Sequence, residues 1–156
     1  MLRLVISGGQ SGSDQGGLEA AEKAGLKRGG YIPNGFVTED GSDPDLARRH
    51  NLIETSSPFY PPRTYANARW ADGTIRFAKD FTSPGEVCTL NAITLYKKPW
   101  IDVNIENPRP VSEVVNWLRE NKIETLNVAG NRESTAPGIH DFVVEYLGKV
   151  FAEVLK

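Results

Sequence analysis

The 156-residue chain contains little of what several kinds of site require. It has one cysteine, Cys88, and two histidines, His50 and His140. A single thiol excludes an internal disulfide and a multi-thiolate metal site, and two histidines argue against a zinc site built from protein ligands. No apolar run approaches the roughly 20 residues of a membrane span, and no signal peptide precedes the first predicted strand. We therefore expect a cytoplasmic protein without a membrane segment and without a protein-built metal site.

The chain also lacks an excess of either charge. It carries 18 Lys and Arg against 20 Asp and Glu, a net charge of −2, and its basic residues are dispersed. No overall positive field would therefore attract nucleic acid or anionic lipid. Hydrophobic residues make up 39% of the chain and charged residues 24%, proportions typical of a folded globular protein. The length and composition predict a single domain over residues 1–156.

The most informative segment follows the first predicted strand. The apolar run of residues 2–6 stops at a cluster of glycine, serine and glutamine, and a helix-forming segment comes next. This order directs free backbone N–H groups and the positive end of a helix dipole toward one point, which suits a phosphate. We predict that the backbone of residues 9–13 binds a phosphate and that the Ser11 and Ser13 hydroxyls add hydrogen bonds. The alternative is an ordinary tight turn that binds nothing.

Two common phosphate motifs are missing from this segment. The dinucleotide fingerprint G-x-G-x-x-G is absent, because Gly9, Gly12 and Gly16 are spaced by three and four residues. A P-loop needs a lysine after its last glycine, and here Gly12 is followed by Ser13 and Asp14. The sequence therefore favours a single phosphate over a nucleoside triphosphate.

Strand-like and helix-like segments alternate along the chain, which is typical of a parallel sheet covered on both faces. We predict an α/β, Rossmann-like fold with a mostly parallel sheet of about six strands in the order 3-2-1-4-5-6. Residues 33–62 are rich in Pro, Gly, Asp, Asn and Ser and are expected to form a long loop. The predicted strands are 2–6, 29–32, 52–54, 73–77, 100–104 and 125–129, and the predicted helices are 14–24, 62–71, 85–96, 111–120 and 137–156.

The predicted topology places a ligand between strands 1 and 4, where the strand order reverses. The glycine-bearing loops after these two strands would meet there, with the loop after strand 6 beside them. Arg63 could make a bidentate contact to phosphate, and Gly85 would let a second helix start approach closely. The candidate binding residues are Gly8, Gly9, Gln10, Ser11, Gly12, Ser13, Asp14, Arg63, Asn67, Ser83, Pro84, Gly85, Glu86, Asn131 and Arg132.

Four collinear parts of the chain resemble the molybdenum-cofactor carrier proteins, Rossmann-like relatives of the LOG and DNA-processing nucleotide-binding folds. The resemblance covers almost the whole chain, although Glu86 stands where a small or hydroxyl residue is expected. The four parts are SGGQSGSD (7–14), GGYIPNG (29–35) with EDG (39–41), Arg63, Thr64, Asn67 and Asp72 followed by SPG (83–85) and Thr89, and LNVAGNRES (126–134) with PGI (137–139).

The resemblance implies a function that is not catalytic. Such a protein would bind and protect molybdenum cofactor, hold phosphate, sulfate or chloride in its absence, and form a homo-oligomer, either a dimer or a tetramer. Molybdoenzymes or cofactor-synthesis proteins would be its transient partners. The phosphate monoester of the cofactor would bind at the helix N-termini.

Two alternatives remain open at this point. A LOG-type enzyme would cleave the N-glycosidic bond of a nucleoside monophosphate, but its P-G-G-x-G-T-x-x-E pattern is broken in residues 84–92, where the second glycine is missing and Ala92 replaces the catalytic acid. A nucleotide sensor without catalysis would bind a nucleotide more tightly than inorganic phosphate.

Overall fold

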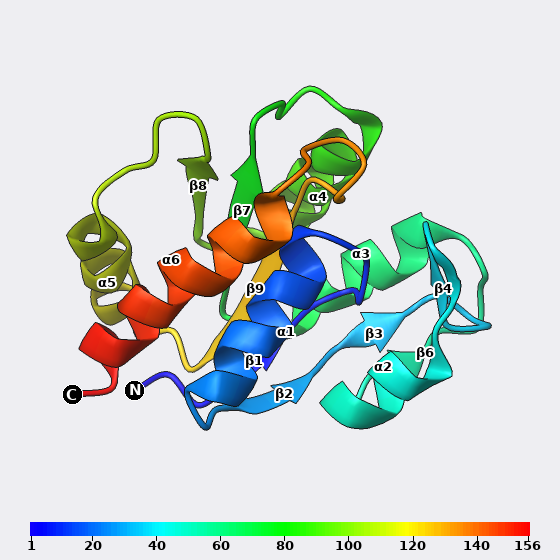
Figure 1. Ribbon diagram of the computed structural model, residues 1–156, viewed down its shortest axis with the longest axis horizontal. Coiled ribbons are helices and arrows are strands. Elements are labelled where there is room, and N and C mark those ends of the chain that lie inside the picture. Colours follow the sequence, from blue (N-terminus) through cyan, green and yellow to red (C-terminus); the bar gives the residue numbers. More distant parts are fainter.

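The fold is built on a central sheet of five parallel strands (Figure 1). A computed structural model describes residues 1–156. The predicted α/β class with a mostly parallel sheet is confirmed. The strands, in their spatial order, are β2 (Lys27–Gly29), β1 (Leu4–Ile6), β9 (Thr125–Gly130), β7 (Gly73–Ala78) and β8 (Trp100–Asn104).

The predicted strand order 3-2-1-4-5-6 is wrong, because the last strand lies at the centre of the sheet. β9 pairs with β1 on one side and with β7 on the other, so β1 and β7 are not neighbours. The side-chain amide of Asn127 on β9 donates a hydrogen bond to the Thr74 hydroxyl of β7 over 3.2 Å, deep inside the protein. This contact satisfies a polar side chain that a central strand would otherwise bury without a partner.

The predicted number of six strands is also too high. The segment expected at 29–32 is divided at Gly30 into β2 and β3 (Tyr31–Ile32), and β3 pairs with β6 (Ile53–Glu54) outside the central sheet. Gly30 has a φ of +126°, and a Cβ there would lie 2.2 Å from the Ser7 carbonyl oxygen. Only glycine fits this close approach, so the chain bends away from the sheet at this residue.

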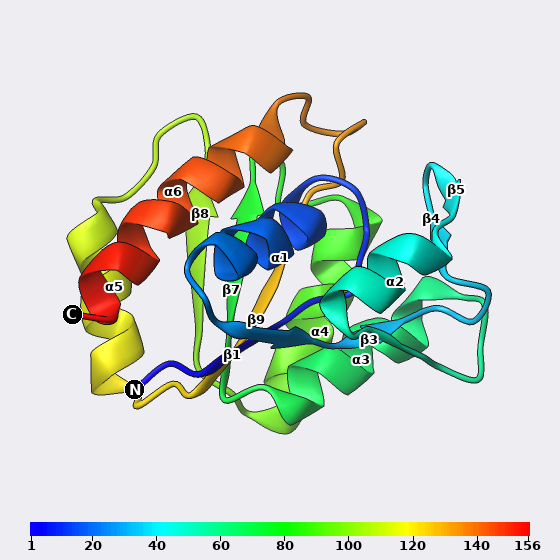
Figure 2. The ribbon, with the colours of Figure 1, turned by 60° about the horizontal axis from the view of Figure 1, so that its bottom comes forward.

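Helices cover both faces of the sheet (Figures 1 and 2). The largest hydrophobic core lies between the sheet and α1, α5 and α6, whereas α3 and α4 share a small cluster of Ala68, Ala92 and Ile93. The hydrophobic cluster between α3 and α4 is thus much smaller than the core on the side of α1, α5 and α6. The helices are α1 (Ser13–Lys23), α3 (Tyr60–Trp70), α4 (Pro84–Tyr96), α5 (Val111–Glu120) and α6 (Ile139–Val154).

Two adjacent glycines let α1 approach its neighbours closely. A Cβ on Gly17 would lie 2.6 Å from a methyl carbon of Val128 on β9, and a Cβ on Gly16 would lie 2.9 Å from the His140 carbonyl oxygen of α6. Glycine costs helix stability relative to alanine, by about 1 kcal/mol per residue. Here the two glycines are required because any Cβ would clash with β9 or α6, which α1 contacts closely.

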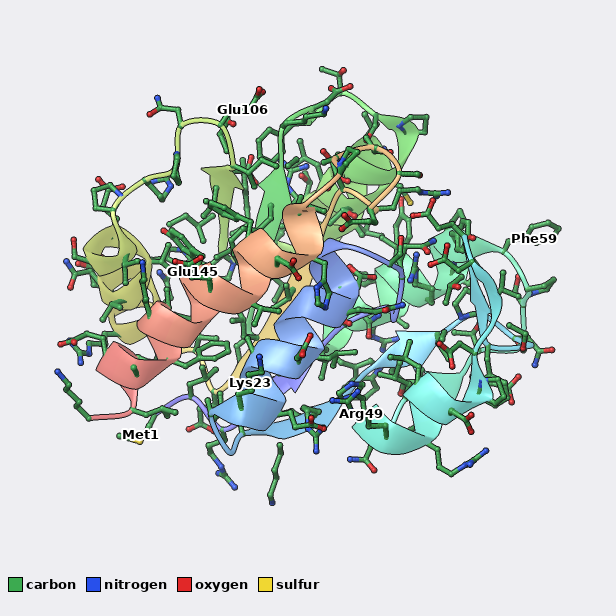
Figure 3. The ribbon with its side chains drawn as sticks, in the orientation of Figure 1. Met1, Lys23, Arg49, Phe59, Glu106 and Glu145 are labelled. Atoms are coloured by element: carbon green, nitrogen blue, oxygen red, sulfur yellow. The ribbon has the colours of Figure 1, made fainter.

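The long loop expected at 33–62 contains regular structure. It includes the hairpin of β4 (Val37–Thr38) and β5 (Gly41–Ser42) and the helix α2 (Pro44–His50). The Asp43 side chain caps α2 by accepting the Leu46 N–H, and Pro44 occupies its first turn. Both signals are present in the sequence. Arg49 of α2, labelled in Figure 3, joins this lobe to α1 through an ion pair with Glu22 at 2.5 Å.

Gly130 is expected to be essential for the closure of β9 on β7. It has a φ of +144°, and a Cβ would lie 2.0 Å from the Phe77 carbonyl oxygen. We expect Gly130→Ala to lower the free energy of unfolding by about 3 kcal/mol or more, because both strain and a backbone clash result. Urea denaturation followed by circular dichroism measures this change.

Gly148 provides the matched control. It lies within α6, and a Cβ there would meet no atom within 4 Å. Gly148→Ala should leave the stability unchanged or raise it by up to about 1 kcal/mol. Equal effects of the two substitutions would contradict this account of Gly130.

Candidate functional site

One cavity of about 510 Å³ opens where β1, β9 and β7 end. The starts of α3 and α4 and the loop after β9 complete its wall. The sequence analysis placed this last loop beside the other two. Because β9 is central, the loop instead forms the middle of the site. The predicted residues that line the cavity are Gly8, Gln10, Asp14, Arg63, Asn67, Ser83, Pro84, Gly85, Glu86, Asn131 and Arg132.

The backbone of the first loop is already engaged within the protein. The Gly9 N–H donates to the Ser7 hydroxyl over 3.3 Å, and the Gln10 N–H donates to a carboxylate oxygen of Asp14 over 3.2 Å. The Ser11 N–H donates to the side-chain carbonyl of Gln10 over 3.0 Å. The Asp14 carboxylate thus accepts the Gln10 N–H, one of the groups that the sequence assigned to a phosphate, and other protein groups accept the N–H groups of Gly9 and Ser11.

The remaining residues of this loop face the protein interior as well. Both the N–H and the hydroxyl of Ser13 donate to the Asn131 carbonyl, at 3.2 and 3.0 Å. A Cβ on Gly12 would lie 2.7 Å from that same oxygen, and the Ser11 hydroxyl donates to Glu39. Gly9, Ser11, Gly12 and Ser13 therefore do not line the cavity. The expectation that the N–H groups of Gly9, Ser11 and Ser13 and the two serine hydroxyls are free for phosphate is corrected.

Arg63 of α3 is a buried cation, 8% exposed, that both stabilises the first loop and faces the cavity. Its Nη1 donates to the Gly8 carbonyl over 2.6 Å and lies 3.4 Å from Asp14 Oδ2, while Nε donates to the Thr64 hydroxyl. Burial raises the pKa of Asp14 to about 6, although Arg63 and the N–H groups of Gln10 and Gly8 act to lower it. The Nη2 group of Arg63 has no partner in the protein.

A second guanidinium lies close to the first. Arg63 and Arg132 stack on the same Tyr60 ring, with 5.1 and 5.4 Å from each guanidinium carbon to the ring centroid. The Arg132 side chain makes no hydrogen bond or ion pair with the protein, and it lines the cavity. The site therefore offers two sets of uncommitted N–H donors, which suit a doubly charged phosphate or oxo anion.

The N-terminus of α4 is open to the same cavity. Ser83 precedes the helix without a side-chain cap, and the N–H groups of Gly85 and Glu86 have no acceptor in the protein. A Cβ on Gly85 would meet no atom within 4 Å, so this glycine is not required by close packing. The positive end of the α4 dipole thus adds to the field of the two arginines.

Glu86 is a buried acid in the first turn of α4. One of its oxygens accepts a hydrogen bond from the Asn131 amide over 3.3 Å, and the other, Oε1, has no partner. Burial raises the pKa of Glu86 to about 7; Asp14 raises it further and Arg76 lowers it. The carboxyl group therefore titrates near neutral pH.

Two of the predicted ligands use their side chains to hold the fold. The amide of Asn67 exchanges two hydrogen bonds with the backbone of Tyr31, at 2.9 and 3.0 Å. The Asn131 oxygen accepts from the N–H groups of Lys79 and Asp80, and its nitrogen donates to the Asp80 carbonyl. Both residues line the cavity, but their polar groups are mostly committed to neighbouring loops.

The sequence interpretation missed several lining residues. The predicted helix 62–71 left Tyr60 out, whereas α3 begins at Tyr60 and the spacing of three then places Tyr60 and Arg63 on one face. Cys88 also lines the cavity, and burial raises the pKa of its thiol. No group of three or more His, Cys, Asp or Glu side chains is placed to hold a metal ion. None of the helices has the length and apolar character that a membrane span requires.

Comparisons with known proteins agree with this architecture. The sequence model of the circularly permutated YpsA SLOG family matches residues 5–151. A crystal structure of a proposed molybdenum carrier protein from Syntrophus aciditrophicus superposes with a TM-score of 0.85. Its sequence is 28% identical, and the match covers 96% of this chain and 94% of that one. None of the curated proteins compared with the chain matches it significantly.

Glu86 is expected to make the stability depend on pH. Its pKa is about 7 in the folded protein against 4.5 ordinarily, so between these values the folded state binds more protons than the unfolded state. The contribution of Glu86 to the free energy of unfolding is therefore complete below the lower value and is lost as the pH rises through the upper one. Arg76, Asp14 and Asp102 are the charged groups that act on Glu86.

Glu86→Gln should remove this contribution, so its unfolding free energy should fall less than that of the wild type between about pH 5 and about pH 8. The difference between the two proteins is the measured quantity, because burial lowers the pKa of His50 and gives an opposite slope. Glu113→Gln, at an exposed acid of α5, is the control. Identical pH slopes in the wild type and Glu86→Gln would contradict the prediction.

Proposed function

The chain belongs to the circularly permutated YpsA SLOG family, and we propose that it binds molybdenum cofactor, protects it and delivers it without catalysing a reaction. The observation that carries the proposal is the pair of arginines, Arg63 and Arg132, with uncommitted N–H groups on one cavity. The volume of about 510 Å³ lies within the range of small-molecule sites. The structural relative described as a molybdenum carrier protein supports the same ligand.

The phosphate monoester of the cofactor is the group that these features would bind. In this proposal its oxygens accept from Nη2 of Arg63, from the guanidinium of Arg132 and from the N–H groups of Gly85 and Glu86. Charge-assisted hydrogen bonds of this kind are stronger than neutral ones. Phosphate, sulfate or chloride would compete for this position. The first loop would then act indirectly, because its Asp14 holds Arg63 in place.

A hydrolase of the LOG type is less well supported. Ala92 stands where that family has its catalytic glutamate, and it is fully buried in the cluster between α3 and α4. A carboxylate at this position would not face the cavity. Of the two acids that do line it, Glu86 stands at the second glycine of the pattern and Asp14 lies outside the pattern. Incubation with AMP tests this alternative directly, and release of free adenine would favour the enzyme.

We further propose that the protein forms a homo-oligomer, a dimer or a tetramer. Large apolar side chains are exposed on α3 and α4 and just before them, namely Phe59 (72% exposed, labelled in Figure 3), Trp70, Val87 and Leu95. Association would remove such side chains from water. Molybdoenzymes or cofactor-synthesis proteins would be the transient partners that exchange the cofactor with it.

Cofactor retention is the direct test of the proposal. Freshly released molybdenum cofactor, mixed with the purified protein, should co-elute with it in gel filtration and oxidise more slowly than free cofactor. The oxidised pterin is followed by its fluorescence. Elution of all cofactor in the small-molecule fractions at micromolar protein would overturn the proposal.

Arg132→Ala should weaken cofactor binding by about 10- to 100-fold, since it removes a charged donor to the phosphate. Its guanidinium has no protein partner other than the Tyr60 ring, so the unfolding free energy should change little. Arg48→Ala, at an exposed arginine of α2 outside the cavity, is the control for net charge. Unchanged binding in Arg132→Ala, or an equal loss in Arg48→Ala, would contradict the assignment.

A further inference from the structure

Two residues that line the cavity each have one buried side-chain atom without a hydrogen-bond partner. These atoms are Nε2 of Gln10 and Oε1 of Glu86, and the remaining such side-chain atom in the protein, Nε of Arg28, belongs to a residue outside the cavity. Gln10 and Glu86 are only 5% and 3% exposed. A buried polar group without a partner is unfavourable and calls for an explanation, of which a ligand is one. Neither atom is needed to bind the phosphate.

The free atom of Gln10 is fixed as a donor by its surroundings. Its side-chain oxygen accepts two hydrogen bonds, from the Ser11 N–H at 3.0 Å and from the Glu39 N–H at 2.8 Å. Rotation of the amide by half a turn would place its NH₂ group against both of these donors. The amide therefore has one stable orientation, which leaves Nε2 without an acceptor.

The free atom of Glu86 is an acceptor when the carboxyl group is ionised, which is the case above a pH of about 7. Its Oε2 faces the Asn131 amide nitrogen, and the oxygen of that amide is held by the N–H groups of Lys79 and Asp80. The Asn131 amide is thus oriented, and its nitrogen points to Glu86. The ionised carboxylate then keeps Oε1 for a donor that the protein does not supply.

A donor and an acceptor on one cavity match the edge of a heterocyclic ring. Pterin and guanine both carry a ring carbonyl next to a ring N–H and an exocyclic amino group, whereas adenine carries an amino group next to an unprotonated ring nitrogen. Resting on the proposed function, we propose that Gln10 Nε2 donates to the ring carbonyl and Glu86 Oε1 accepts from the N–H and amino groups, so that the cavity selects a 2-amino-4-oxo-pyrimidine edge.

Three nucleoside monophosphates separate this recognition from phosphate binding, because they share the phosphate and differ in the ring edge. Titration calorimetry of GMP, IMP and AMP at about pH 8, where Glu86 is ionised, should give GMP the highest affinity and AMP the lowest, with about a 30-fold difference between them. IMP keeps the carbonyl and the N–H but lacks the amino group, so it should be intermediate. Equal affinities of GMP and AMP, or failure of all three to bind, would overturn the ring-edge proposal.

Substitutions of nearly identical shape test the two side chains. Glu86→Gln should lower the affinity for GMP by about tenfold and change that for AMP by less than about twofold. Gln10→Glu keeps the oxygen that accepts from Ser11 and Glu39 and replaces only the free donor, so it should also reduce the preference for GMP. Glu113→Gln, at an exposed acid of α5, is the matched control, and far-UV circular dichroism checks that each variant folds.

The double variant Gln10→Glu with Glu86→Gln gives the sharpest result. It places an acceptor where the donor was and a donor where the acceptor was, which is the pattern that adenine fits. Its preference should therefore change from GMP to AMP. Retention of the wild-type preference would overturn the proposal.

The outcome for Arg132→Ala distinguishes the two proposals. If the phosphate site is real, this variant should weaken GMP, IMP and AMP by the same factor. Uniform weakening without any preference among the rings would leave the phosphate site standing and remove the ring-edge assignment. Failure of the wild-type protein to retain cofactor in gel filtration would instead remove the proposed function itself.

Discussion

The insertion of β9 between β1 and β7 is the constraint on which the rest of the site depends. It brings the loop that carries Asn131 and Arg132 into the middle of the sheet edge, between the first loop and the start of α4. Asn131 then binds the loop after β7, and the Ser13 N–H and hydroxyl bind the Asn131 carbonyl. The three loops are therefore one hydrogen-bonded unit, not independent walls of a crevice. The close approach of α1 through Gly16 and Gly17 follows from the same arrangement.

One acid and two arginines of this unit are linked by a chain of contacts. The Asp14 carboxylate accepts from the first loop and pairs with Arg63, and Arg63 shares the Tyr60 ring with Arg132. One anion of the chain thus positions one cation, and the second cation remains free of ion pairs. Nη1 of Arg63 holds the first loop, whereas its Nη2 has no protein partner. Loss of Arg63 would therefore disturb the loop as well as the cavity. Arg132 separates these two effects.

The sequence predicted the local elements well and their neighbours poorly. The bounds of β8 and α5 follow directly from their apolar patterns, and Gly25, which has a φ of +76°, stands just after the end of α1. The place of β9 could not be obtained from its own residues, because a buried apolar run does not reveal which strands flank it. Asn127 and Thr74 are polar residues in two buried strands, and such residues require hydrogen-bond partners. Their pairing is the sequence feature that relates β9 to β7.

The candidate site was found as a region but not as a set of contacts. Most predicted residues do line one cavity, yet the N–H groups of the first loop donate to acceptors within the protein, and that of Gln10 donates to the acid Asp14. A glycine-rich turn before a helix predicts that something negative will sit there. It does not predict whether that anion comes from a ligand or from the next turn of the chain.

An acid that is part of the chain has a further consequence. The Asp14 carboxylate is tethered four residues from the Gln10 N–H that it accepts, so its effective local concentration far exceeds that of any dissolved anion. Inorganic phosphate, which is abundant in every cell, therefore cannot displace it from the first loop. The loop keeps its shape whatever the buffer contains, and competition between solutes is confined to the arginines and the α4 N-terminus, where a bulky organic monoester can gain contacts that a bare ion cannot.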